Sequence, residues 1–211
     1  MPKREQLLQS LQPENMHAAF LLAQAGGVPN ELQLIVETAQ YDAEKEALIP
    51  QQGYIIRVLG TLEFRIDNLG ATVEQIQLLN EHPLLDQYNK RPAALFFRGQ
   101  PDNVYELIID ISQAHASAFR GYRAFPTYLN VSQPLVELFQ SGGGLVGQMP
   151  LSFAQTLEKV LQHHGLETKI IEGEEPDPIA KGVYDNLAQV LLIGSSYFVS
   201  YSFSIEELAK R

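Results

Sequence analysis

The chain contains 211 residues, carries a formal net charge of −10 and has no cysteine. The lack of cysteine excludes disulfides, thiolate nucleophiles, Fe–S clusters and cysteine zinc sites. A negative field repels phosphate backbones, so we expect no nucleic-acid partner. No window approaches the ~20 apolar residues that span a bilayer. The composition therefore predicts a soluble cytoplasmic protein without a membrane partner.

This length predicts one globular domain over residues 1–211, with residues 1–30 as a helical N-terminal appendage. Residues 31–41 are rich in β-forming side chains and predict a strand. Residues 54–66 predict a clearer strand, because apolar residues from Ile56 to Ile66 alternate with a row that carries charge. This alternation is typical of a strand with one buried face.

Two helices are predicted in the middle of the chain. Thr72 and Gln75 form a capping-box pattern, which opens a helix that ends at His82, directly before a proline. The most regular apolar stripe runs from Pro101 to Phe119 and predicts a longer amphipathic helix.

Further elements follow toward the C-terminus. A short helix is expected at 133–140, with Ser132 as its cap. Ser152 opens a second capping box, for a helix that ends at Gly165. Residues 172–178 predict an acidic loop that contains two prolines. Short apolar or alternating runs predict the remaining strands, at 93–97, 166–171, 189–193 and 196–204, and the last two are joined in a hairpin at Gly194 and Ser195.

The order of these elements predicts the fold class. Strand pairs at both ends with helices between them indicate an α+β fold, with a mixed, largely antiparallel sheet and helices mainly on one face. A doubly wound α/β sheet is the alternative, because strands and helices also alternate in the middle of the chain.

Glycines gather in the stretch FQSGGGLVGQMP, residues 139–150. Gly142, Gly144 and Gly147 match the dinucleotide fingerprint, but a predicted helix rather than a strand precedes them. The phosphate-loop interpretation lacks its lysine, since Gln148 follows the last glycine. We interpret residues 141–147 as a helix C-cap that runs into a flexible connection, with a loop that moves over a ligand as the alternative. No cofactor is predicted.

The histidines give weak indications of acid–base or metal chemistry. His115 lies on the apolar stripe of its helix, which favours a buried structural side chain. His82 lies beside Glu81 at a predicted helix end and is the better candidate for proton transfer. The adjacent histidines at 163 and 164 point about 100° apart on a helix, so they cannot bind one metal together. No metal site is predicted.

Arg57, Glu63 and Arg65 share one face of the 54–66 strand. If that face is exposed, these residues form an ordinary cross-strand charge pattern. If it is covered, buried charges must be paired, and an arginine could hold an anionic ligand in a pocket. In that interpretation, Glu63 or His82 is the proton carrier, and His115 is a third weak candidate.

Aromatic residues and arginines alternate in FRGYRAFPTY, residues 119–128, and aromatic residues recur in the last predicted strand. Tyrosine and arginine are common anchors of protein interfaces. The predicted interface residues are Tyr122, Arg123, Phe125, Tyr128, Tyr197 and Tyr201.

Two functions remain open. The favoured one is a non-catalytic regulatory or protein-interaction module, with a protein partner or a second copy of the chain, because no catalytic set is assembled in the sequence. The alternative is a protein or enzyme that binds a small anionic molecule near Arg57, Glu63 and His82.

Overall fold

The structure is a computed structural model that describes residues 16–67, 69–73, 76–176 and 187–208. The chain divides into two compact units: unit 1 contains the described residues up to His82 and those from 187 onward, and unit 2 contains residues 83–176. Unit 2 is therefore inserted into the sequence of unit 1, and each unit has its own hydrophobic core. None of the helices in these ranges has the length and apolar character needed to cross a bilayer.

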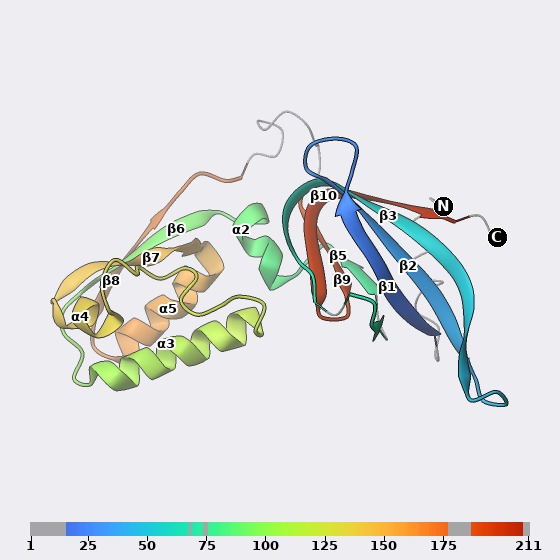
Figure 1. Cartoon of the computed structure of the whole chain (residues 1–211). Helices are drawn as coiled ribbons and strands as arrows, with labels where there is room; N and C mark the ends of the chain where they lie inside the picture. Colours follow the sequence, from blue (N-terminus) through green and yellow to red (C-terminus); the bar gives the residue numbers. More distant parts are fainter. Residues whose placement is uncertain (1–15, 68, 74–75, 177–186, 209–211) are drawn as a thin grey trace. The chain divides into compact units, whose positions relative to one another are not determined.

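Unit 1 is built from one seven-stranded sheet in which all recorded pairs are antiparallel. The strand order is β4-β1-β2-β3-β10-β9-β5 (Figure 1). The strands are β1 (Met16–Ala25), β2 (Glu31–Asp42), β3 (Ala47–Arg65), β4 (Thr72–Val73), β5 (Ile76–Leu79), β9 (Gln189–Ile193) and β10 (Ser196–Glu207).

The sheet of unit 1 curls around a single core. Its two edge strands, β4 and β5, are consecutive in sequence, and the three Cα steps from Val73 to Ile76 span at most about 11 Å. The two edges of the sheet are therefore brought close together. Every strand supplies at least one buried apolar side chain to the same cluster, which includes Phe20, Leu34, Ile56, Val73, Ile76, Leu191 and Phe198.

Strand β3 confirms the alternation predicted for residues 54–66 only as far as Val58. Ile56 and Val58 are fully buried, whereas Arg57 between them is half-exposed. Gly60 has a positive φ of 68°, a conformation that glycine adopts without a steric penalty. Beyond it β3 curves away (Figure 1), and its apolar residue Phe64 is 49% exposed at the end of the strand.

Unit 2 contains a three-stranded antiparallel sheet of order β7-β6-β8 together with all the helices among the described residues. Helix α5 contacts each of the three strands, and helix α3 packs against α5 and α4. The elements are η1 (Pro83–Leu85), α2 (Asp86–Asn89), β6 (Pro92–Arg98), α3 (Val104–Phe119), α4 (Leu135–Gln140), β7 (Gly143–Pro150), α5 (Leu151–His163) and β8 (Glu167–Glu172).

Helix α3 ends at Phe119 as predicted but begins at Val104, three residues later than the predicted start at Pro101. The Asn103 side chain accepts hydrogen bonds from the backbone N–H groups of Tyr105 and Glu106, two of the donors that a helix start leaves without partners. The helix ends at Phe119, because Arg120 adopts a left-handed conformation with φ 49°. The predicted stripe faces the core of unit 2, with Leu107 and Ile111 fully buried.

The α+β class and the largely antiparallel pairing are confirmed, and the described strands form no parallel, doubly wound sheet. Two further predictions differ from the structure. Residues 16–25 of the predicted N-terminal helix form strand β1, while residues 1–15 lie outside the described residues. The chain also forms two compact units where we predicted one domain.

The helix predicted at 72–82 is wrong, because the described residues of this segment form β4, β5 and the start of a loop, while residues 74–75 lie outside the described residues. Thr72 pairs with Ala19 of β1, and Leu78 pairs with Leu191 of β9. Pairing with distant strands therefore overrides the local capping pattern. The strand at 31–41 and the hairpin at Gly194 are confirmed.

The predicted helix caps in unit 2 are also corrected. Helix α4 follows Pro134, whereas the N–H of Ser132 donates to the side chain of Asn130 in a local turn. Helix α5 has Pro150 at its N-cap, two residues earlier than the predicted cap Ser152, and the Ser152 hydroxyl donates to Asp86 at 3.1 Å. Neither serine therefore caps its helix.

Candidate functional site

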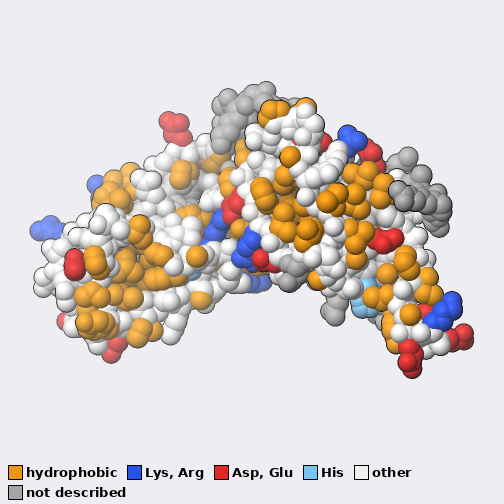
Figure 2. Space-filling model, in the orientation of Figure 1, with side chains coloured by type: hydrophobic (Ala, Val, Ile, Leu, Met, Phe, Trp, Pro, Cys, Tyr) orange, Lys and Arg blue, Asp and Glu red, His pale blue; other side chains and the backbone are white. Residues whose placement is uncertain are grey.

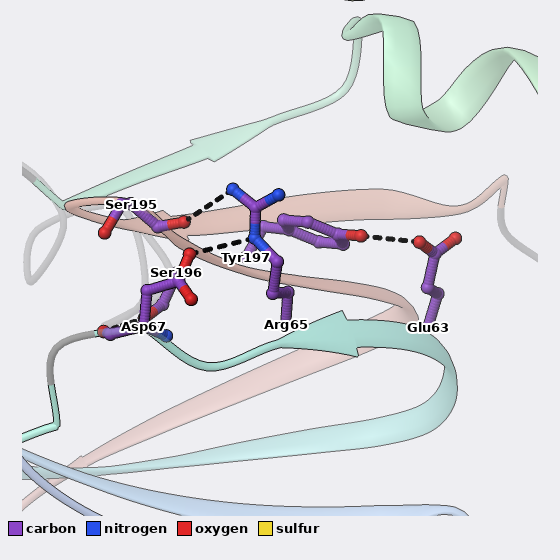
Figure 3. Close-up of polar contacts among 6 residues, drawn as sticks. All are labelled: Glu63, Arg65, Asp67, Ser195, Ser196 and Tyr197. Atoms are coloured by element: carbon purple, nitrogen blue, oxygen red, sulfur yellow. Dashed lines mark hydrogen bonds and ion pairs between the residues drawn. The ribbon is translucent and has the colours of Figure 1, made fainter. Parts of the chain in front are cut away.

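Glu63 and Arg65 of β3 lie beside Tyr197 of β10, and we call these three residues the β3–β10 cluster (Figure 3). The Tyr197 hydroxyl donates to Glu63 Oε1 over 2.6 Å. The Arg65 guanidinium lies 5.3 Å from the centre of the Tyr197 ring, a cation–π geometry. The tyrosine is 5% exposed, whereas the Arg65 side chain is 42% exposed. The cluster is thus anchored by a buried ring and opens to solvent at the arginine.

The loop after β3 and the β9–β10 hairpin complete this site (Figure 3). Arg65 Nε lies 2.9 Å from Asp67 Oδ2, and a second guanidinium nitrogen donates to the Ser195 carbonyl at 3.4 Å. The fully buried Ser196 hydroxyl donates to the Asp67 carbonyl at 2.6 Å and accepts from the Asp67 N–H at 2.8 Å. The hydrogen bonds of Arg65 and of Ser196 therefore hold the loop after β3 against the β9–β10 hairpin.

This geometry assigns the cluster a structural task. Arg65 binds Asp67 and Ser195, Tyr197 binds Glu63, and Ser196 is engaged with backbone rather than placed beside a base. The ion pair is half-exposed and contributes little by itself, about 0–1 kcal/mol. The buried Ser196 and Tyr197 contacts carry most of the stabilisation, because unpaired buried polar groups are costly.

Removing the Tyr197 hydroxyl tests this assignment. We expect Tyr197→Phe to lower the free energy of unfolding by about 1 kcal/mol, because Glu63 loses a hydrogen bond but regains water in part. Urea unfolding with the exposed Tyr41→Phe as control measures the loss. In a double-mutant cycle with Glu63→Ala, a coupling energy of zero between positions 63 and 197 would contradict the structural assignment.

Arg57 lies away from this cluster along β3. Arg57 pairs with Glu206 on β10 at 3.7 Å, with both side chains about half-exposed. Six residues of strand, roughly 20 Å, separate Arg57 from Glu63. His82 is half-buried at the end of the first segment of unit 1. The predicted set is therefore split: Glu63 and Arg65 are neighbours, and Arg57 lies apart.

His115 belongs to the core of unit 2, as its position on the apolar stripe predicts. It is 3% exposed, and aromatic rings surround it at 4.8 Å (Phe119), 5.5 Å (Phe125) and 5.7 Å (Phe153) between centroids. Its Nε2 atom has no hydrogen-bond partner among the described residues. Burial lowers the pKa of His115 below its ordinary value of 6.5, because the protonated ring would lose its hydration.

This burial predicts a pH dependence of stability. Below pH 6.5 the unfolded chain takes up a proton at His115 while the folded chain resists it, so the free energy of unfolding falls as the pH falls. The slope from this group is at most about 1.4 kcal/mol per pH unit. We expect His115→Leu to remove this contribution, so that the variant gains stability relative to the native protein between pH 7 and pH 5.

Urea unfolding at successive pH values measures this difference. The exposed His163→Gln serves as the control for removing a histidine that lies outside the core. Parallel profiles for His115→Leu and the native protein would contradict the prediction.

The predicted interface residues differ in exposure. Phe125 is 39% exposed, while Tyr122, Arg123 and Tyr201 are half-buried. Tyr128 and Tyr197 are buried, so the expectation that they present surface to a partner is corrected. The Tyr128 hydroxyl donates to Gln87 at 3.2 Å, and its ring packs on Phe119. A buried side chain of this kind stabilises its own unit.

The glycine segment forms strand β7 rather than a flexible connection. Gly142 has a φ of 84° after α4, which confirms the predicted C-cap conformation. Gly147 pairs with Leu95 of β6 and bridges to Leu129 on its other side. A Cβ at Gly147 would lie 2.0 Å from the Tyr128 carbonyl oxygen, so this glycine permits close backbone approach. The described residues contain no group of side chains able to hold a metal ion.

Sequence reasoning missed Asp67, Ser195 and Ser196. No local signal marks them, because Ser196 lies 129 residues from its partner Asp67. The predicted hairpin at Gly194 was the nearest indication.

In the comparisons with known proteins, no family model, curated protein or solved structure matches the chain.

Proposed function

We propose that the protein is a non-catalytic protein-interaction module whose binding surface lies on unit 2. The observation that carries this proposal is an apolar patch on α3 and α4. Tyr105 is 66% exposed and Ile109 is 55% exposed, one turn apart on α3. Apolar side chains gather over α3 and α4 in Figure 2. The part-buried Ile108, Leu135 and Val136 complete what we call the α3–α4 patch.

The exposed side chains of this patch, Tyr105 and Ile109, are large and apolar, and such side chains are costly to leave in water. Single exposed apolar residues are ordinary, but neighbouring ones that continue into a hydrophobic core are typical of interaction surfaces. We also infer that the helices lie mainly on one face of the unit 2 sheet. The contacts of α5 with β6, β7 and β8, and of α3 with α5, support this inference. The outer side of α3 then faces away from the sheet.

The alternative, a binder of small anionic molecules, has less support. Glu63 accepts a hydrogen bond from Tyr197, and the arginines considered for the anion pair with Glu206 and Asp67. An anion at either arginine would have to compete with a carboxylate. Native mass spectrometry of the purified protein would detect a retained small molecule and so favour this alternative.

Quantitative capture tests the proposed function. We would compare immobilised native protein with Tyr105→Ser/Ile109→Ser and with Ile171→Ser, which alters an isoleucine on β8 that is 49% exposed. The expected result is a protein retained by the native chain and by the β8 control but lost from the patch variant. Its complex with the native chain is then rebuilt from purified components by size-exclusion chromatography. Equal retention on all three baits overturns the proposal.

A further inference from the structure

The charged residues around the α3–α4 patch indicate the chemistry of its partner. Segment 101–119 holds Asp102, Glu106 and Asp110 but no lysine or arginine, and α4 adds Glu137. Asp102, Glu106 and Glu137 are exposed. The apolar surface is therefore rimmed by carboxylates, in a chain whose net charge is −10.

The apolar and acidic residues form two parallel rows on α3. Tyr105 and Ile109 are four residues apart, and so are Glu106 and Asp110, so each pair lies on one line about 6 Å long. The rows are offset by one residue, or about 100° around the helix. Asp110 Oδ2 lies 2.8 Å from Nε2 of His164, the C-cap residue of α5, which places the acidic row on the α5 side of α3.

These rows have a helical complement. An amphipathic helix that lies along α3 would place its apolar stripe on Tyr105 and Ile109, since helical ligands present anchors at i, i+3, i+4 and i+7. Lysine or arginine beside that stripe would face Glu106 and Glu137. A second copy of this acidic chain would bring carboxylates against carboxylates, which opposes association.

We infer that the α3–α4 patch binds a basic amphipathic helix of a partner protein. This inference rests on the proposed function and adds the chemistry of the partner. The apolar row supplies most of the affinity, because desolvated aromatic and aliphatic side chains dominate interface energetics. The acidic row favours a partner of positive charge and raises the association rate.

Fluorescence anisotropy with two labelled 18-residue peptides tests the inference on the full chain. Both peptides carry leucine at i, i+3, i+4 and i+7, and their polar positions are all lysine in one and all glutamate in the other. We expect the lysine peptide to bind and the glutamate peptide to bind at least tenfold more weakly. Tyr105→Ser/Ile109→Ser should weaken the lysine peptide about tenfold, a loss typical of interface anchors.

Charge neutralisation on the rim gives the second readout. Glu106→Gln/Glu137→Gln should weaken the lysine peptide and flatten its salt dependence, whereas Glu44→Gln in unit 1 and Ile171→Ser should change neither. Equal binding to the native chain and the patch variant would overturn the inference, because it would show attraction to net charge alone. A dimer of the native chain that Tyr105→Ser/Ile109→Ser dissociates would also overturn it.

The capture experiment separates a failure of the basic-helix inference from a failure of the proposed interaction function. A captured protein that depends on Tyr105 and Ile109 but not on Glu106 and Glu137 keeps the interaction function and overturns the basic helix. Capture that ignores all four residues overturns both.

Discussion

Replacing Phe198 with alanine is expected to lower the free energy of unfolding of unit 1 by about 4 kcal/mol. Phe198 is fully buried in the core that all seven strands share. Its ring lies edge-on to Phe20, with 5.9 Å between the ring centroids, and stacks on Phe64, with 6.3 Å between the centroids. The substitution removes most of a large side chain and leaves a cavity that a curled sheet cannot close without shifting its strands.

Phe64→Ala is the matched control for this prediction. It removes a ring that stacks on the same Phe198 but is 49% exposed, so we expect a loss of about 1 kcal/mol. Hydrogen exchange read by mass spectrometry assigns the effect to unit 1, through peptides from β1–β3 and β9–β10. Similar losses for the two variants would show that Phe198 is not a core residue and would contradict the structure.

Gly147→Ala should cost about 3 kcal/mol, near the upper end of overpacking. The added Cβ would meet the Tyr128 carbonyl oxygen at 2.0 Å and the Leu129 Cα at 3.0 Å. Both are backbone atoms, so no rotamer change relieves the clash. The segment at Leu129 must move away from β7, and Asn130 then loses its backbone hydrogen bond to Val146.

Gly27→Ala provides the comparison, because a Cβ there meets nothing within 4 Å and the residue is not among those with positive φ. We expect its stability to stay within about 0.5 kcal/mol of the native value, as for ordinary surface changes. Far-ultraviolet circular dichroism at 222 nm follows unit 2, which holds all the described helices. A Gly147→Ala chain as stable as Gly27→Ala would disprove the close approach of the 128–130 segment.

The elements that sequence predicted best carry their own periodicity. Helix α3 has an uninterrupted apolar stripe, and the β9–β10 hairpin pairs two apolar runs around Gly194. Strands β4 and β5 were missed because partners far along the chain define them. Thr72 illustrates this, since its local pattern favours a helix cap but its backbone pairs with Ala19.

The candidate site was predictable only in pieces. Glu63 and Tyr197 each stood out, one as a strand carboxylate and one as an interface tyrosine, but they are 134 residues apart in sequence. Their meeting depends on the position of β10 beside β3, which no local pattern encodes. The exposure of Tyr105 and Ile109 likewise depends on which side of α3 packs against α5.

The insertion of unit 2 also determines the order in which a ribosome completes the fold. Strands β1 to β5 are made first, unit 2 follows, and β10 is made last although it lies between β3 and β9. Synthesis of residues 83–187 takes roughly 5–20 s at about 5–20 residues per second. Throughout that interval the nascent chain carries β3 with one edge open, and pairing with another chain competes with completion of unit 1.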